Sequence, residues 1–394
     1  MQPAETARLN AQVAVFTTAR TLNNTFARIV YPFLGTFARG LGGPVEQVAS
    51  VVAARSALGM TSPFLSGVAE RYGRRTAMLL ALAIFIVGLL TVATFPTLLG
   101  FTVGMLIGAL GKIIFDPAVL AYIGDRVPYE RRGQVLAITE LSWSLSFIIG
   151  MPITGLLIRE FDWRAPFPVL AGAVLIVGLE LMRLVQPDGP TDQADIKPPL
   201  SGLGTVVQSR AALAGIVFGV VTGVANEVVN ISYGIWLERS FGLVVTALGL
   251  TAGVIGVADL LGEGVVIGLV DRIGKRRLLI VGLLANSAAA IALPFWGNLG
   301  TIGALVGLFV FYGTFEIIIV GSIPLMTEIV PAARATMMGG YFASWSVGRA
   351  LGALGGPFIF ALETGGLPML SNGIATAAGN LIGLALLLAL IRRA

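Results

Sequence analysis

Charged side chains inside apolar segments are the residues of this chain best placed to do chemistry. The 394-residue sequence contains no histidine and no cysteine, which excludes imidazole and thiolate chemistry, disulfide bonds and the metal sites that those side chains form. Proton transfer is therefore left to carboxylates. Each charge within a long apolar stretch costs about 2.5–3.5 kcal/mol unless it faces a partner or water. The charges so placed are Arg20, Arg28, Arg55, Lys112, Asp116, Glu140, Glu227, Asp259, Glu263, Glu316 and Arg349.

A pair of acids in the eighth apolar stretch is a candidate for proton coupling. Asp259 and Glu263 are four residues apart, so a helix would place both carboxylates on one face. Two like charges in a low dielectric cannot both stay ionised, and one of them is expected to hold a proton near neutral pH. The alternative is that Arg349 or Arg55 neutralises one acid while Glu263 is hydrated.

The first apolar stretch carries polar side chains along one helical face. At about 100° per residue they fall within a stripe about 80° wide, which predicts a surface that lines a water-filled path. The alternative is that Arg20 and Arg28 neutralise carboxylates of other helices. Lys112 and Asp116, four residues apart, are expected to neutralise each other. The residues of the stripe are Thr17, Arg20, Asn24, Arg28 and Tyr31.

The seventh stretch has a similar polar face, formed by Asn226, Glu227 and Asn230. We expect this face and Arg349 to line the same cavity as the first stretch. Glu227 and the lone carboxylate Glu316 are further candidates for proton coupling.

Composition and length define the elements that must position these residues. Hydrophobic residues make up 56% of the chain and charged residues 12%, with a mean hydropathy of +0.89. Only a bilayer can solvate this excess, so soluble enzymes, collagens and disordered proteins are excluded. Twelve apolar stretches are each long enough to cross a hydrocarbon core of about 30 Å as a helix. They cover residues 13–36, 46–66, 76–95, 98–122, 134–158, 166–185, 211–236, 243–267, 278–296, 300–323, 336–361 and 367–390.

The positive charges between these stretches predict the orientation. With the amino terminus in the cytoplasm, seventeen Lys and Arg residues lie in cytoplasmic segments and four on the opposite side. Both termini are therefore expected to be cytoplasmic, in a multi-pass protein of the cell membrane without a removable signal peptide. This topology also accounts for the net charge of +5, so nucleic acid is not an expected partner.

Three motifs recur in the same order at a nearly constant offset, which predicts two six-helix halves. The segment 70–75 returns as 271–277, offset by 201 residues, and the segment 125–128 returns as 328–331, offset by 203. Pro152 and Pro357, 205 residues apart, mark the third motif. We therefore predict an amino-terminal bundle over residues 1–186, a cytoplasmic linker over 187–209 and a carboxy-terminal bundle over 210–394.

This pattern resembles the major facilitator superfamily of secondary transporters along the whole chain. The resemblance implies a cytoplasmic gate in the loop after the second helix of each half, with an acid at the end of the fourth helix joining its charges. Three features depart from the family pattern: Glu70 stands where aspartate is usual, Gly67 and Gly268 stand three residues before the acid instead of four, and Gly104 lies near the position of an arginine found in proton-coupled members. The alternative is that the loops carry only positive-inside charge. The implied gate residues are Glu70, Arg71, Gly73, Arg74, Arg75, Asp125, Asp271, Arg272, Gly274, Lys275 and Arg276.

Glycines inside the stretches allow two interpretations. Gly150-Met151-Pro152 with Gly155 resembles part of a motif that marks exporters in this superfamily, and the alternative is a simple packing and kinking role. Gly100, Gly104 and Gly108, four residues apart, are expected to let the fourth helix approach a neighbour closely.

The leading hypothesis from the sequence is a secondary transporter that works by alternating access, coupled to protons, and exports a small amphipathic or drug-like compound. The alternatives are proton-coupled uptake of an organic anion or sugar, with Arg20, Arg28 and Arg349 as charge partners, and a lipid flippase. No nucleotide-binding loop is present, so neither ATP nor another cofactor is expected, and neither is enzymatic activity. The expected partners are a small-molecule substrate, protons and lipid, and the expected state is a monomer.

Overall fold

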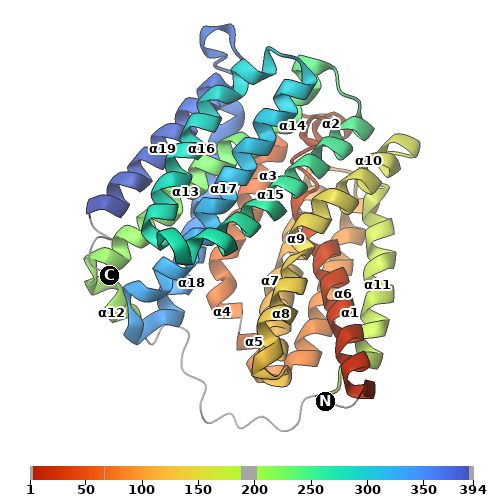
Figure 1. Ribbon diagram of the computed structural model, residues 1–394. Helices are drawn as coiled ribbons and strands as arrows, with labels where there is room; N and C mark the ends of the chain where they lie inside the picture. The colour runs from red at the N-terminus through yellow and green to blue at the C-terminus, as the bar shows by residue number, and fades with distance from the viewer. Residues whose placement is uncertain (1–2, 66, 188–201, 390–394) are drawn as a thin grey trace. The chain divides into compact units, whose positions relative to one another are not determined.

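The structure is a computed structural model that describes residues 3–65, 67–187 and 202–389, and all regular elements in these ranges are helical (Figure 1). The first part of the chain forms α1 (Pro3–Arg28), α2 (Leu34–Gly40), α3 (Val45–Leu58), α4 (Ser62–Leu65), α5 (Gly67–Tyr72), α6 (Arg74–Thr94), α7 (Leu98–Arg126), α8 (Tyr129–Glu140), α9 (Ser142–Leu145), a π-helical segment (Ser146–Gly150), α10 (Met151–Glu160) and α11 (Pro166–Leu184). The second part forms α12 (Leu203–Gln208), α13 (Arg210–Asn230), α14 (Tyr233–Phe241), α15 (Val245–Ile273), α16 (Lys275–Gly297), α17 (Thr301–Ile329), α18 (Arg334–Phe360) and α19 (Leu370–Ala389).

These helices confirm the predicted all-α membrane fold with twelve crossings. Nine of the described helices are long and apolar enough to cross a bilayer by length and composition alone. The other three predicted crossings are also helical. They correspond to α1 with α2, to α3 with α4, and to α18. The first two are interrupted, by a turn at residues 29–33 and by a 3-10 turn at Gly59–Thr61.

Packing divides the described chain into two compact units. The first unit contains residues 3–29 and 61–187, and the second contains residues 30–60 and 202–389. The two interruptions therefore coincide with the unit borders. The predicted boundary at residue 186 remains a prediction, and residues 188–201 of the predicted linker lie outside the described residues.

In the first unit, α6 and α7 pack closely because glycines line their contact. A Cβ on Gly88 would meet the backbone nitrogen of Gly108 at 2.5 Å, and one on Gly104 would meet the carbonyl oxygen of Gly88 at 2.7 Å. This packing confirms the predicted close approach of the fourth crossing helix.

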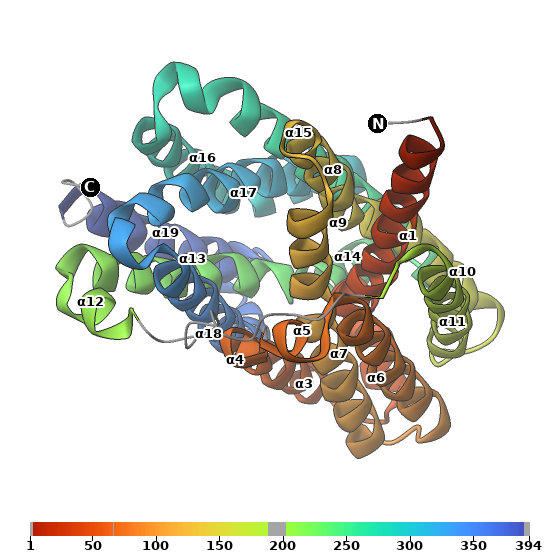
Figure 2. The same cartoon turned by 90° about the horizontal axis from the view of Figure 1, so that it is seen from below.

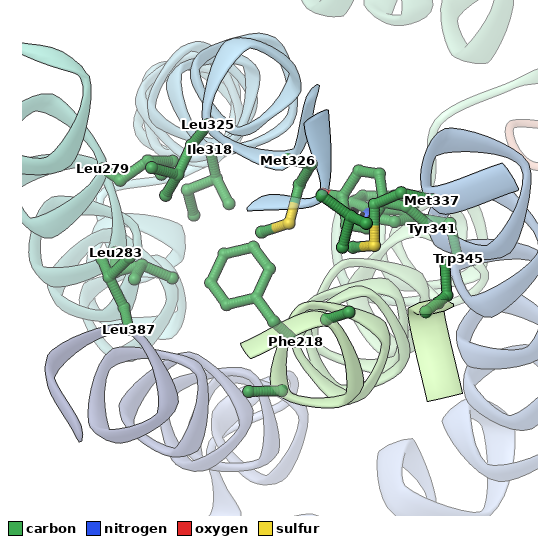
Figure 3. Packing of buried hydrophobic residues seen from close by; sticks show 14 of the residues in the cluster. Phe218, Leu279, Leu283, Ile318, Leu325, Met326, Met337, Tyr341, Trp345 and Leu387 are labelled. Atoms are coloured by element: carbon green, nitrogen blue, oxygen red, sulfur yellow. Dashed lines mark hydrogen bonds between the residues drawn. The ribbon is translucent and has the colours of Figure 1, made fainter. Parts of the chain in front are cut away.

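In the second unit, an apolar cluster around Phe218 of α13 joins α13 to α12, α16, α17, α18 and α19 (Figure 3). Leu279 and Leu283 of α16, Met326 of α17 and Tyr341 of α18 belong to this cluster. α13 also packs along α18, and α3 packs against α18 from the segment of residues 30–60 (Figure 2). The second unit thus contains the later parts of the first two crossing helices together with α13 and α18.

Candidate functional site

The first unit contains a buried charge network between α1, α7 and α8, which we call the first-unit network. Nη1 of Arg20 lies 2.7 Å from Oε1 of Glu140, and its Nε lies 3.5 Å from Oδ1 of Asp116. Nζ of Lys112 lies 2.6 Å from Oδ2 of Asp116 and donates to Oδ1 of Asn24 at 2.6 Å. The predicted Lys112–Asp116 pair is confirmed, and Arg20 pairs with carboxylates of other helices, as the alternative interpretation expected. Two cations and two anions make this network neutral.

Arg28 lies on aromatic side chains, one turn after Asn24 along α1. Its guanidinium carbon is 4.7 Å from the ring centroid of Trp143 and 4.2 Å from that of Phe147, which suits cation–π attraction. Phe147 belongs to the π-helical segment that precedes Pro152, and at the end of this segment Gly150 packs directly against Thr25 of α1. Segments of this kind are frequent at functional sites. The motif glycine therefore brings an aromatic surface next to α1.

The second unit contains a different polar cluster, the second-unit network, formed by Tyr31, Arg55, Glu227, Asn230 and Arg349. Glu227 is fully buried and accepts three hydrogen bonds: from the Tyr31 hydroxyl at 2.9 Å, from Nε of Arg349 at 3.0 Å and from Nδ2 of Asn230 at 3.2 Å. The Tyr31 oxygen in turn accepts from Nη2 of Arg55 at 3.3 Å and from Nη2 of Arg349. A carboxylate that accepts charge-assisted bonds of this kind is held firmly in place.

Glycines explain how α13 and α18 bring Glu227 and Arg349 together. A Cβ on Gly352 would meet Cβ of Glu227 at 2.6 Å, so a larger residue there would displace the acid. On the other side of the network, Tyr31 lies in the turn between α1 and α2, and Gly234 of α14 approaches the carbonyl oxygen of Pro32. The close helix packing at Gly352 thus gives the ion pair its geometry.

The structure divides the polar stripe that the sequence predicted on the first helix. Arg20, Asn24 and Arg28 belong to the first unit, whereas Tyr31 follows the break of α1 and belongs to the second. Of the predicted cavity residues in the second unit, Asn230 joins the network. Asn226 is buried, and its Nδ2 has no hydrogen-bond partner in the part of the chain that the structure describes.

Sequence reasoning missed two members of this environment. Arg55 was expected only as a possible partner of Asp259 or Glu263, and Tyr312 was not singled out. The Tyr312 hydroxyl donates to Oδ1 of Asn230 at 2.7 Å from α17. The charge of Arg55 inside an apolar stretch was a usable signal. Tyr312 offers no such signal, because its partner is 82 residues away.

The eighth crossing helix packs against Glu316 at the turn that carries two acids. Asp259 is buried and Glu263 is partly exposed, both on α15. Between them, a Cβ on Gly262 would meet Cβ of Glu316 of α17 at 2.6 Å. α17 therefore contacts α15 through Glu316, at the turn that carries the predicted pair. Arg349, a predicted partner of that pair, forms its ion pair with Glu227 instead. The coupling role of these three acids remains a prediction.

The cytoplasmic loop motif forms equivalent ion pairs in the two units. Nε of Arg74 lies 3.1 Å from Oδ2 of Asp125 in the first unit, and Lys275 pairs with Glu328 in the second. The second basic residue of each motif then donates to a backbone carbonyl near the end of the last helix of its unit. These bonds join Arg75 to Met182 and Arg276 to Leu388.

The motif glycines adopt the same unusual backbone conformation. Gly73 has φ 85° and Gly274 has φ 84°, each directly before a long helix, in a region that side chains disfavour. Arg71, Asp271 and Arg272 are exposed, and the side chain of Glu70 lies outside the described part of the structure. The repeat therefore extends to backbone geometry, while the role of these residues as a gate remains a prediction.

At the opposite ends of the helices, the second unit has an ion pair near its surface. Nη1 of Arg39 on α2 lies 2.5 Å from Oε1 of Glu238 on α14. Gly35 accommodates the Glu238 carboxylate, which lies directly against its Cα. This pair joins the end of the first crossing helix to the end of the seventh, on the side that we predict to be extracellular.

Comparisons with known proteins agree with this architecture. A family model described as Major Facilitator Superfamily matches residues 16–226 and again residues 215–394. The uncharacterized MFS-type transporter YceJ of Bacillus subtilis (strain 168) is 27% identical over 302 residues, which cover 75% of this chain and 76% of that protein. Multidrug resistance protein MdtG of Serratia proteamaculans (strain 568) is 27% identical over 296 residues, or 71% of each chain. The crystal structure of a D-xylose-proton symporter has the same fold, with a TM-score of 0.77 at 16% identity over 96% of both chains.

The family model matches once in each half, as the repeat in the sequence requires, and together the two matches cover nearly the whole chain. The relatives are transporters of the membrane, which confirms the prediction of a multi-pass transport protein and not an enzyme. The chain therefore belongs to the major facilitator superfamily.

Proposed function

We propose that this chain is a proton-coupled secondary transporter that exports a small amphipathic compound by alternating access. The observation that carries the proposal is the position of Glu227. This buried carboxylate joins Tyr31, from the first crossing helix, to Arg349, from the eleventh. A protonatable group therefore holds together helices that come from the two sequence halves.

Protonation of Glu227 would weaken this contact for a simple electrostatic reason. The ionised carboxylate accepts three hydrogen bonds, one of them from a guanidinium, whereas a neutral acid loses the charge that strengthens them. Proton binding and separation of the helices then favour each other, which is the linkage that coupled transport needs.

The segment of residues 30–60 would move in such a cycle. It packs on α18 and is held to α14 by the Arg39–Glu238 pair, so the ends that we predict to be extracellular are closed. Opening to the outside requires these contacts to break. The name of the multidrug resistance relative supports a drug-like substrate.

The test is transport by purified protein in liposomes that contain a pH-sensitive dye. A proton gradient is imposed, and pools of amphipathic cations, organic anions and sugars are added in turn. We expect one pool to drive proton movement, and Glu227→Gln to reduce this flux by at least about tenfold. Glu180→Gln is the matched control, because Glu180 pairs with its neighbour Arg183 on the exposed face of α11.

Two other results would redirect the proposal. If Glu227→Gln keeps full flux and Asp259→Asn/Glu263→Gln loses it, the coupling site is on α15 instead. If a pool is transported but no proton moves in any variant, proton coupling is excluded and a uniporter or lipid transporter fits better.

A further inference from the structure

The second-unit network carries an excess positive charge. Arg55 and Arg349 both donate to the Tyr31 oxygen, and Arg349 also pairs with Glu227. Two guanidinium groups and one carboxylate leave a net charge of +1. Arg55 is only 6% exposed, and its Nη1 is buried without a hydrogen-bond partner in the described part of the chain.

The neighbouring polar groups cannot balance this charge. The Tyr31 oxygen accepts from both arginines and donates its proton to Glu227. Asn230 also donates to Glu227 through its amide nitrogen, and its oxygen accepts from Tyr312. These groups leave Nη1 of Arg55 without a hydrogen-bond partner in the described part of the chain. An uncompensated buried charge is strongly unfavourable unless a ligand supplies the opposite charge.

We propose that Arg55 and Arg349 bind a small anionic group, and that in transport this group is the carboxylate of the exported compound. This inference rests on the proposed function, since it names the substrate class as amphipathic organic acids. The guanidinium carbons lie 5.9 Å and 5.8 Å from the centroid of the Tyr31 ring. Because Nη2 of each arginine donates to the same Tyr31 oxygen, the two groups are close enough to contact one ligand.

Access to the site is provided by Arg349. Its side chain is 31% exposed although its partner Glu227 is fully buried, so the network reaches accessible space at this residue. An incoming carboxylate would meet Arg349 first and would then take up the free hydrogen-bonding capacity of Arg55. A bidentate guanidinium–carboxylate contact suits this chemistry.

Thermal unfolding of the full-length protein in detergent, followed by tryptophan fluorescence, tests the proposal. The probes are acetate and benzoate, with acetamide and benzamide as neutral counterparts and chloride as the inorganic anion. We expect a carboxylate at tens of millimolar to raise the apparent unfolding temperature by about 2 °C, and the amides to have no effect. A rise with chloride alone would support the anion site and identify an inorganic ion as its ligand.

Variants separate a binding arginine from a structural one. Arg55→Gln removes the excess charge, so it is expected to abolish the anion-dependent rise and to unfold no earlier than wild type in anion-poor buffer. Arg55→Lys keeps the charge and should keep part of the rise. Arg39→Gln, at an exposed arginine outside the network, should keep all of it. Glu227→Gln removes the carboxylate that competes with the added anion for the arginines, and it should increase the anion-dependent rise in unfolding temperature.

The inference is overturned if no anion raises the unfolding temperature of the wild type, or if Arg55→Gln unfolds several degrees earlier with the anion effect intact. The proposed function fails separately, in the liposome assay. Anion binding without proton flux would retain the site and reject the transport cycle, whereas proton flux driven only by cations would retain the cycle and reject the site.

Discussion

The two buried networks use similar residues but differ in their charge balance. In the first-unit network, Arg20 and Lys112 are matched by Asp116 and Glu140. In the second-unit network, Glu227 pairs with Arg349 and Arg55 joins through Tyr31, so its described members are two cations and one anion. Balanced charges can hold helices together without a ligand, whereas an unbalanced buried charge is a cost that binding can remove. The comparison indicates that charge balance, more than charge itself, distinguishes a structural cluster from a binding site in this chain.

The largest effect is expected from Arg20→Gln, which would show the contrast most directly. It leaves Asp116 and Glu140 with one cation between them, and because these side chains are 21% and 42% exposed the expected cost is about 1–3 kcal/mol. We expect a clearly lower unfolding temperature, opposite to the effect of Arg55→Gln. Arg20→Lys, measured by the same tryptophan fluorescence, should recover part of the loss. Equal behaviour of the two Gln variants would break the comparison.

A cross-link between the positions of Arg39 and Glu238 would test whether the ends of α2 and α14 have to separate during transport. The chain contains no cysteine, so Arg39→Cys/Glu238→Cys introduces the only two thiols. We expect a short bifunctional thiol reagent to reduce transport by about tenfold, reversibly if the linker is cleavable. Glu180→Cys/Arg183→Cys on α11 is the control, because its pair lies within one helix. Full transport by the cross-linked outer pair would show that these ends need not separate.

Substitutions at the glycines of the repeated loop motif should lower the unfolding temperature equally in the two units, in contrast to substitutions in the two networks. Gly73→Ala and Gly274→Ala each force a side chain into a positive φ, at a cost of about 1 kcal/mol. Thermal unfolding should show similar losses for both. Gly172→Ala and Gly264→Ala, inside helices with open space around a Cβ, should be neutral or slightly stabilising. Unequal losses of stability at Gly73 and Gly274 would mean that the repeated motif does not contribute equally to the stability of the two units.

The smallest effect is expected at Asp162, outside both networks. Hydrogen bonds from the Arg164 side chain and from nearby backbone N–H groups lower the pKa of Asp162. A lowered pKa contributes stability above the unfolded value of about 4, and this contribution is lost as the pH falls through the folded value. Asp162→Asn should therefore unfold slightly earlier than wild type at pH 7, with the difference shrinking below about pH 4. A difference that does not depend on pH would assign the effect to the neutral hydrogen bonds.

Local patterns in the sequence predicted the features that depend on neighbouring residues. Lys112 and Asp116 pair because they are one helical turn apart, and Gly73 and Gly274 take equivalent conformations because their motif repeats. The partners of Glu227 could not be predicted in this way. Tyr31 reaches it across 196 residues, and no periodicity encodes such a contact. The break after Arg28 was also missed, since the polar stripe continues through it with helical spacing.

The grouping of residues 30–60 with the second half has a consequence for how the protein is made. Tyr31 and Arg55 enter the bilayer during synthesis, but Glu227 is added 196 residues after Tyr31. At ribosomal speeds of about 5–20 residues per second, this is a delay of about 10 to 40 s. During that time Arg55 has to be accommodated by the insertion machinery, by lipid headgroups or by a temporary partner helix. The later parts of the first two helices therefore complete their folding only after the seventh and eleventh have been inserted.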